Sequence, residues 1–99
     1  MILKAYSIYD RAARAYAQPF FAPSDGVAVR MVDATARDPS TNLARYPQDY
    51  MLYWVGSFDD QEGMFTRGDP VQIASVVGLL SEEQGDRSND ERVNVEETK

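Results

Sequence analysis

The residues best suited to chemistry in this 99-residue chain are basic and aromatic side chains that alternate near the N-terminus. Arginine and lysine bind phosphate and aromatic rings stack on bases, so this mixture is typical of single-strand nucleic-acid binders. Tyr6 and Phe20 equally suit a core, and the arginines could simply solubilise a loop. The predicted nucleic-acid contacts are Arg11 and Arg14 for phosphate, Tyr9 and Tyr16 for stacking, and Lys4 as a further basic side chain.

Most catalytic chemistry is missing from the sequence. The absence of cysteine and histidine removes thiol nucleophiles, imidazole bases and zinc sites of the Cys/His type. No glycine-rich phosphate loop followed by Lys and Ser/Thr occurs. We therefore expect no enzyme, no cofactor and no metal site.

Two other short patterns have structural explanations. Asp59, Asp60 and Glu62 could hold a hard cation, but they lack the alternating spacing of a calcium loop and fall in a predicted turn. Arg67-Gly68-Asp69 spells an adhesion tripeptide, which a Gly-Asp-Pro turn explains. We expect solvated turns at both places.

Charge is distributed unevenly along the chain, whose net charge is -6. Ser81 to Lys99 carries seven acids and three bases, whereas Met1 to Arg45 carries six bases and four acids. An acidic protein seldom binds nucleic acid, but the basic N-terminal half keeps that function open. The alternative is a non-enzymatic, dimeric adaptor that binds another protein.

The hydropathy pattern indicates a protein without a membrane span or export signal. The longest apolar stretches are Met51 to Val55 and Val76 to Leu80, far below the roughly 20 residues of a spanning helix. The first ten residues lack the apolar region of a signal peptide. Together with the lack of cysteine, this predicts a cytoplasmic protein.

The elements that must position these residues begin with a strand over Ile2 to Tyr9. A loop with a possible helical turn follows, and then an extended Phe20-Phe21-Ala22 between two prolines. Ser24 fits the N-cap of an amphipathic helix that Asp38-Pro39 ends.

The second half predicts a β-hairpin. Tyr50 to Phe58 reads as a strand with Tyr50, Leu52, Trp54 and Phe58 on one face. After a loop ending in Gly63, Met64 to Arg67 returns as its partner. Asp69-Pro70 could start a short helix, although its valines equally suit a strand.

These elements predict an α+β fold: a small antiparallel or mixed sheet of about three strands on one main helix. Residues 1–80 would form the single domain and residues 81–99 a disordered acidic tail. A core this small leaves on the order of 3 to 5 kcal/mol of stability, so we expect a homo-oligomer, by base rate a dimer.

Several segments, in this order and spacing, resemble a known family. They are Ser7-Ile8-Tyr9-Asp10, Pro19-Phe20-Phe21-Ala22-Pro23, Val27-Ala28-Val29-Arg30, Asp38-Pro39, Tyr46-Pro47-Gln48-Asp49-Tyr50-Met51-Leu52-Tyr53 and Gly56-Ser57-Phe58-Asp59-Asp60-Gln61-Glu62-Gly63. Between Ile2 and Phe65 the chain resembles the small non-structural protein of gokushovirus-type microviruses, which are single-stranded DNA phages. The resemblance implies a host-cytoplasm protein of phage replication, described as DNA-binding or assigned to viral strand synthesis. It supplies no catalytic residues.

Overall fold

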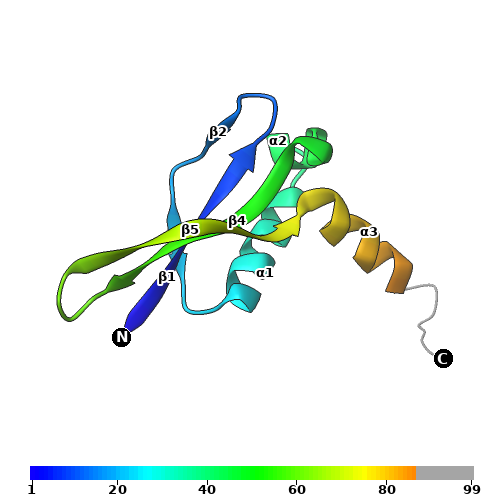
Figure 1. The fold of residues 1–99 in the computed structure, drawn as a ribbon. Coiled ribbons are helices and arrows are strands. Elements are labelled where there is room, and N and C mark those ends of the chain that lie inside the picture. The colour runs from blue at the N-terminus through cyan, green and yellow to red at the C-terminus, as the bar shows by residue number, and fades with distance from the viewer. Residues whose placement is uncertain (87–99) are drawn as a thin grey trace.

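The computed structural model describes the backbone of residues 1–86 and the side chains of residues 1–81. Figure 1 shows a curled sheet with helices at one side. In chain order the elements are β1 (Ile2–Asp10), β2 (Ala15–Tyr16), β3 (Phe20–Ala22), α1 (Asp25–Ala36), α2 (Asn42–Arg45), a 3-10 turn η1 (Pro47–Asp49), β4 (Tyr50–Asp59), β5 (Met64–Ser75) and α3 (Val76–Asp86). The predicted α+β class is confirmed.

The sheet is antiparallel and has five strands, more than the three predicted. Its order is β2-β1-β4-β5, and β3 pairs with the same edge of β1 as β2 does. The two additional strands come from residues 11–22: β2 lies where a loop was predicted, whereas β3 is the segment that was predicted to be extended. The Asp10 carboxylate accepts hydrogen bonds from the amides of Ala12 and Ala13 at 3.0 and 3.3 Å. This turn reverses the chain, so that Tyr16 pairs with Tyr9.

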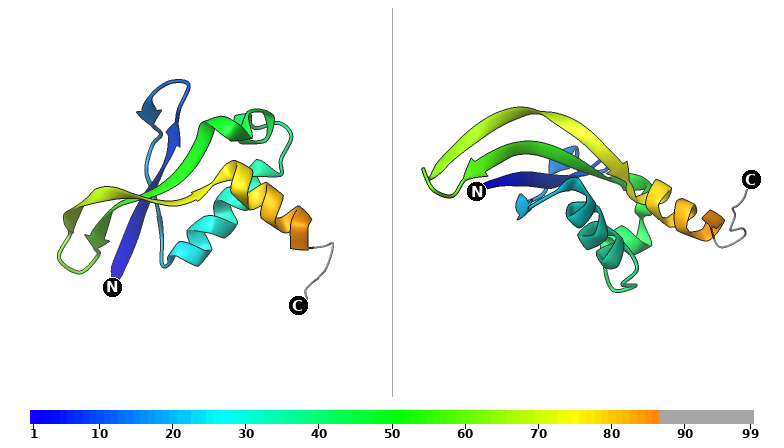
Figure 2. Two further views of the ribbon diagram at one scale, coloured as in Figure 1. Left: turned by 45° about the vertical axis from the view of Figure 1, so that its right-hand side comes forward. Right: turned by 90° about the horizontal axis from the view of Figure 1, so that it is seen from below.

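The helices cover only one face of the sheet, which we call the helix face and which carries Tyr6 and Leu52. Figure 2 shows α1 on one side of the curved strands. The buried side chains of α1 are small or β-branched: Ala28, Val32 and Ala36. Small residues bring the helix axis close to the sheet, which lets a large ring fill the space between them. Val76 of α3 completes the same core.

Tyr6 is the largest fully buried side chain. Its hydroxyl donates a 2.5 Å hydrogen bond to Asp25 Oδ1, and Lys4 Nζ lies 3.5 Å from the same oxygen. Asp25 is the first residue of α1. The bond therefore satisfies a buried hydroxyl and fixes the start of the helix over β1. Phe20 stacks on the Tyr6 ring with centroids 5.8 Å apart, so both residues lie in the core as predicted.

The predicted caps of α1 are confirmed. Ser24 is the N-cap, and its hydroxyl accepts a hydrogen bond from the Val27 amide at 3.3 Å. Asp33 and Arg37 form an i,i+4 ion pair at 3.3 Å. The connection from α1 to β4 contains the short helix α2, whose N-cap is Thr41.

A β-bulge in β4 changes the predicted faces of that strand. Tyr6 pairs with Trp54 whereas Ala5 pairs with Gly56, so Val55 is the extra residue on β4. The prediction that Phe58 shares a face with Leu52 and Trp54 was therefore wrong. An inserted residue reverses the alternation of side chains beyond it, and Phe58 points to the face opposite the helices.

β5 is longer than predicted, and no helix starts at Asp69-Pro70. Both residues lie within the strand, at an irregularity between Arg67 and Val71 on an edge where proline is tolerated. A Cβ at Gly68 would come within 2.3 Å of the Trp54 ring. The middle residue of the Arg-Gly-Asp sequence is thus explained by packing against Trp54, which itself packs against the core.

The C-terminal helix α3 extends to Asp86. Its helical backbone passes residue 80, where the domain was predicted to end. The rest of the predicted acidic tail, residues 87–99, lies outside the described residues.

The Tyr6 hydroxyl generates a prediction about stability. Burial, and then the hydrogen bond and the negative charge of Asp25, raise the pKa of Tyr6 well above its usual value near 10. The folded state thus holds this proton more tightly than the unfolded state does. Stability should be full below pH about 10 and should fall as the pH rises further.

We expect Tyr6→Phe to lower the free energy of unfolding by about 1.5 kcal/mol at neutral pH, because Asp25 loses a donor. Urea denaturation at pH 8 and at pH about 10.5 measures both effects. The variant should lose less stability between these pH values than the wild type. Tyr50, whose pKa burial also raises, contributes equally to both proteins. Equal losses in the two proteins would contradict the assignment.

Candidate nucleic-acid interface on the open face

The face of the sheet opposite the helices, here called the open face, is defined by residue pairing. Partner residues in antiparallel strands point to the same side, and alternate residues of a strand share a face. The open face consists of Leu3, Ala5, Ser7, Tyr9, Tyr16, Phe21, Met51, Tyr53, Gly56, Phe58, Phe65, Arg67, Gln72 and Ser75. No described helix contributes to it.

Three tyrosines form one aromatic cluster on this face. Tyr9 and Tyr16 are direct partners with ring centroids 4.8 Å apart. Tyr53 meets their rings edge-on, at 6.2 Å from Tyr9 and 5.6 Å from Tyr16. Such contacts contribute roughly 0.5–1.5 kcal/mol each beyond burial. Tyr16 nevertheless remains 46% exposed, so this tyrosine cluster presents a ring surface to solvent.

Three phenylalanines form a second cluster farther along the strands. Phe58 lies 4.8 Å from its pairing partner Phe65, and Phe21 lies 5.9 Å from Phe58 and 6.1 Å from Phe65. Phe21 is 41% and Phe65 70% exposed. The phenylalanine cluster is therefore also open to solvent.

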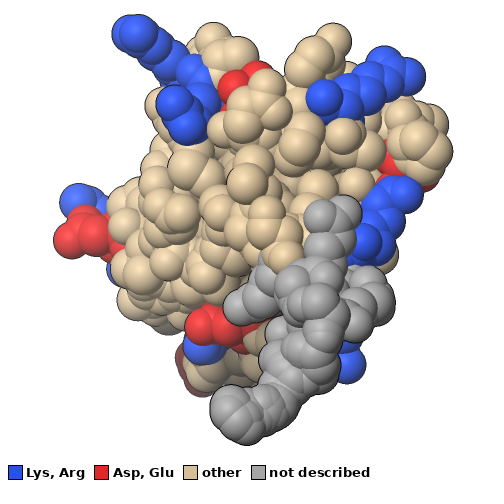
Figure 3. All heavy atoms as spheres, turned by 90° about the vertical axis from the view of Figure 1, so that its right-hand side faces the viewer, with Lys and Arg blue, Asp and Glu red and all other residues tan. Residues whose placement is uncertain are grey.

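Among the open-face residues that have a pairing partner in the sheet, only Arg67 is charged, and Asp69 follows it two positions later at the unpaired irregularity of β5. Within the described part of the chain Arg67 forms no ion pair. Seen from the α3 end, basic side chains stand apart round the rim of the molecule rather than in one patch (Figure 3). The open face is thus an aromatic surface whose paired positions carry one positive charge.

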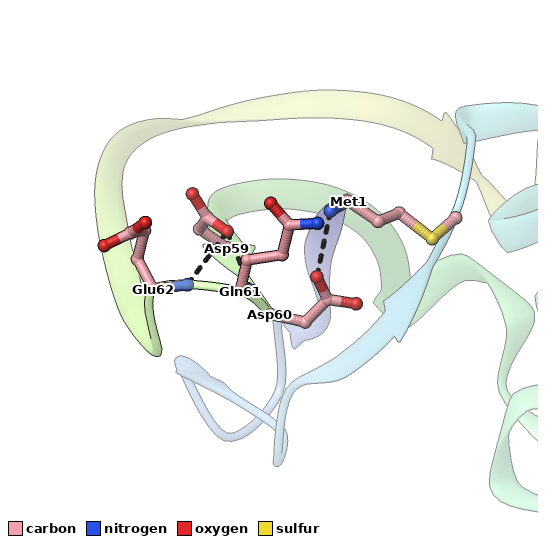
Figure 4. A network of polar contacts seen from close by, with 5 residues as sticks. All are labelled: Met1, Asp59, Asp60, Gln61 and Glu62. Carbon is pink, nitrogen blue, oxygen red and sulfur yellow. Dashed lines mark hydrogen bonds and ion pairs between the residues drawn. The ribbon is translucent and has the colours of Figure 1, made fainter.

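Two of the three acids of the β4–β5 turn, Asp59 and Asp60, have partners within the protein (Figure 4). The carboxylate of Asp59 accepts hydrogen bonds from the amides of Gln61 and Glu62 at 2.9 and 3.2 Å. Asp60 pairs with the amino group of Met1 at 2.9 Å. Gly63 has a φ of 69°, as the predicted turn required. Among residues 1–81, whose side chains the structure describes, no three carboxylates gather in a group that could hold a metal ion.

The structure brings together four of the five predicted site residues. Tyr9 and Tyr16 pair at one end of the open face, and the turn between their strands holds Arg11 and Arg14. Arg11 Nη1 lies 3.5 Å from the Gln48 carbonyl, and Arg14 is exposed.

Lys4 does not lie in this group. It alternates with Ala5 on β1 and therefore points to the helix face, where it contacts Asp25. Its assignment as a nucleic-acid contact has no support from this position. Consecutive residues of a strand lie on opposite faces, so closeness in the sequence does not give closeness in the site.

Five residues that supply rings or charge to this face were not among the predicted site residues: Phe21, Tyr53, Phe58, Phe65 and Arg67. Tyr53 could have been found from its alternation with Leu52, which separates the two faces of β4. Phe65 and Arg67 carry no local signal, because their position depends on the pairing of β5 with β4 beyond the bulge.

Arg14 has an unusual backbone conformation. Its φ is 56°, the one positive value among the described residues other than glycine. A side chain in this region costs about 1 kcal/mol, and glycine avoids that cost. The structure gives Arg14 no hydrogen bond from its guanidinium that would compensate. Backbone strain of this kind clusters at functional sites, which makes the charge of Arg14 a candidate for a functional contact.

These features define a small α+β protein with a one-sided sheet and an open aromatic face. Residues 3–79 match the model of the Phage ORF5 protein family, and the chain belongs to that family. The match extends past Phe65, where the recognised resemblance ended.

A curated relative supports the same assignment. The chain is 38% identical to "Protein ORF5" of Chlamydia phage 1 over an alignment of 64 residues. This alignment covers 61% of this chain and 67% of the relative. This relative comes from a gokushovirus-type microvirus, so the predicted resemblance is confirmed. No solved structure matches. None of the described helices is long and apolar enough to cross a membrane.

The strained turn generates a second prediction. Arg14→Gly should raise the free energy of unfolding by up to about 1 kcal/mol, because glycine adopts this φ without strain, although greater freedom of the unfolded chain offsets part of the gain. Arg14→Ala, which keeps the strain, is the matched control and should leave stability nearly unchanged. Urea denaturation of the three proteins measures this. A glycine variant less stable than the alanine variant would contradict the role of φ.

Proposed function

We propose that this phage protein binds single-stranded DNA on its open face during genome synthesis in the host cytoplasm. The main observation that supports this proposal is the tyrosine cluster, in which three rings from β1, β2 and β4 gather on a face without a covering helix. Arg11 and Arg14 lie in the adjoining turn. A sheet face with exposed rings is the arrangement on which single-stranded bases stack.

The distribution of charge supports this proposal despite the acidic composition. Acids near the strands are engaged elsewhere: Asp10 caps its turn, Asp25 binds Tyr6, and Asp59 orders the hairpin. None occupies a paired strand position on the open face. A phosphate backbone would therefore meet rings and arginines there, and an uncharged surface limits repulsion.

We expect modest, salt-sensitive affinity, because few arginines border the site. Fluorescence anisotropy with labelled oligodeoxythymidine of about 12 nucleotides, at about 50 and 200 mM salt, measures it. Tyr16→Ser should weaken binding about tenfold, since one stacked base contributes roughly 1–3 kcal/mol. Arg11→Glu with Arg14→Glu should abolish it, and thermal melting should remain nearly unchanged.

The matched control changes two exposed arginines on the helix side. Arg30→Glu with Arg45→Glu alters the net charge equally, but neither residue borders the open face. This variant should bind far better than Arg11→Glu with Arg14→Glu. If both double variants lose affinity equally, general charge rather than a site explains binding. If the wild type binds nothing at low salt, the proposal fails.

The second candidate is a homodimeric, non-enzymatic adaptor for a phage or host replication protein. The observation that favours it is the outer edge of β5, which pairs with no other described strand. This edge carries Met64 and Val71, which are 62% and 51% exposed. Unpaired edge strands with apolar side chains are surfaces on which a second sheet can pair.

Sedimentation across micromolar concentrations tests the dimer. A β5 edge pair predicts a concentration-dependent dimer that Val71→Lys disrupts, because a charge on an edge strand opposes pairing. Val77→Lys, a surface change on α3, is the control and should leave the dimer intact. A wild-type protein that stays monomeric at high micromolar concentration would exclude this candidate.

A further inference from the structure

The phenylalanine cluster is not used by the tyrosine site described above. Phe65 is the most exposed large hydrophobic residue of the described chain, at 70%, even though it contacts two other rings. An exposed phenyl group on a strand at the sheet edge favours aggregation. The exposed ring of Phe65 is therefore a candidate contact for a binding partner that would cover it.

Arg67 lies between the two aromatic clusters. It pairs with Gly56, which pairs with Ala5, so its two nearest neighbours in this row are small, and Phe21 lies beyond them as the partner of Ala5. The next row on one side holds Phe58 and Phe65, and Tyr53 lies on the other side. The guanidinium thus projects beside small residues, with rings in the rows before and after it.

We propose that the phenylalanine cluster and Arg67 form a second nucleotide-binding position, continuous with the tyrosine cluster. This inference rests on the proposed function. A bound single strand runs along β4, stacks a base on Tyr16, passes a phosphate at Arg67 and stacks another base on Phe65. Phe58 lies five positions after Tyr53 on β4, so the two stacking positions lie about 15 Å apart at roughly 3.3 Å per residue, allowing for the bulge.

Charge favours a nucleic-acid strand over a second copy of this chain as occupant. Two open faces packed together would bury Arg67 of each copy against aromatic rings, and among the described residues Arg67 has no ion pair that would offset the cost of burying its charge. A polyanion supplies a phosphate to this arginine instead. Arginine suits the position because its planar group binds phosphate and also stacks on rings.

The test measures the affinity of the full chain for labelled oligodeoxythymidines of about 4 and about 12 nucleotides by fluorescence anisotropy at low salt, and compares the two affinities. The wild type should bind the longer strand at least tenfold more tightly. Phe65→Ser and Arg67→Gln should each remove most of that gain and leave affinity for the short strand within about twofold. Arg67→Gln should also reduce the salt slope by about one unit.

Two control variants separate this position from general effects. Met64→Ser removes an equally exposed neighbour that alternates with Phe65 and so lies off the open face; it should bind both strands as the wild type does. Tyr16→Ser should weaken binding of both strands. Circular dichroism verifies that each variant is folded.

The outcomes distinguish this inference from the proposed function. If the wild type binds neither strand, the proposed function fails and this inference fails with it. If Tyr16→Ser loses affinity while Phe65→Ser and Arg67→Gln keep the length-dependent gain, only the second position is overturned. If Phe65→Ser instead shifts the sedimentation of the free protein and keeps that gain, the occupant is a second copy, which also overturns it.

Discussion

The burial of Tyr6 is the constraint on which the rest of this small fold depends. A ring of this size fits between sheet and helix because α1 presents Ala28 and Ala36 to the core. Its hydroxyl would be costly to bury alone, so it binds Asp25 at the first turn of α1. One interaction thus holds the helix against β1, satisfies a polar group and fixes which face of the sheet is covered.

Covering one face leaves the other without a second layer. In residues 1–86 the chain has no further helix for that face. Six aromatic rings pack there instead, in two clusters of three. Mutual packing hides part of each ring and leaves Tyr16, Phe21 and Phe65 exposed. The same clusters therefore help to hold the strands together and form the surface to which we assign DNA binding.

Acidic residues in this chain serve local structure more than surface potential. Asp10, Asp38 and Asp59 accept backbone amide hydrogen bonds in turns. The paired strand positions of the open face carry no acid, so a chain with a net charge of -6 still presents an aromatic surface on which Arg67 is the one charged residue with a pairing partner. Net charge describes the whole molecule, whereas binding depends on the charge at one face.

Local chemistry in the sequence determined the helix cap at Ser24, the glycine turn at Gly63, the main strands and the absence of Cys/His chemistry. These features depend on residues a few positions apart, which a single sequence displays. Tertiary structure alone decided that residues 11–22 add two strands, that the Val55 bulge moves Phe58 to the open face, and that Lys4 is separated from Arg11 and Arg14. Each of these outcomes depends on strand pairing between distant residues, where one inserted residue exchanges the two faces of a strand.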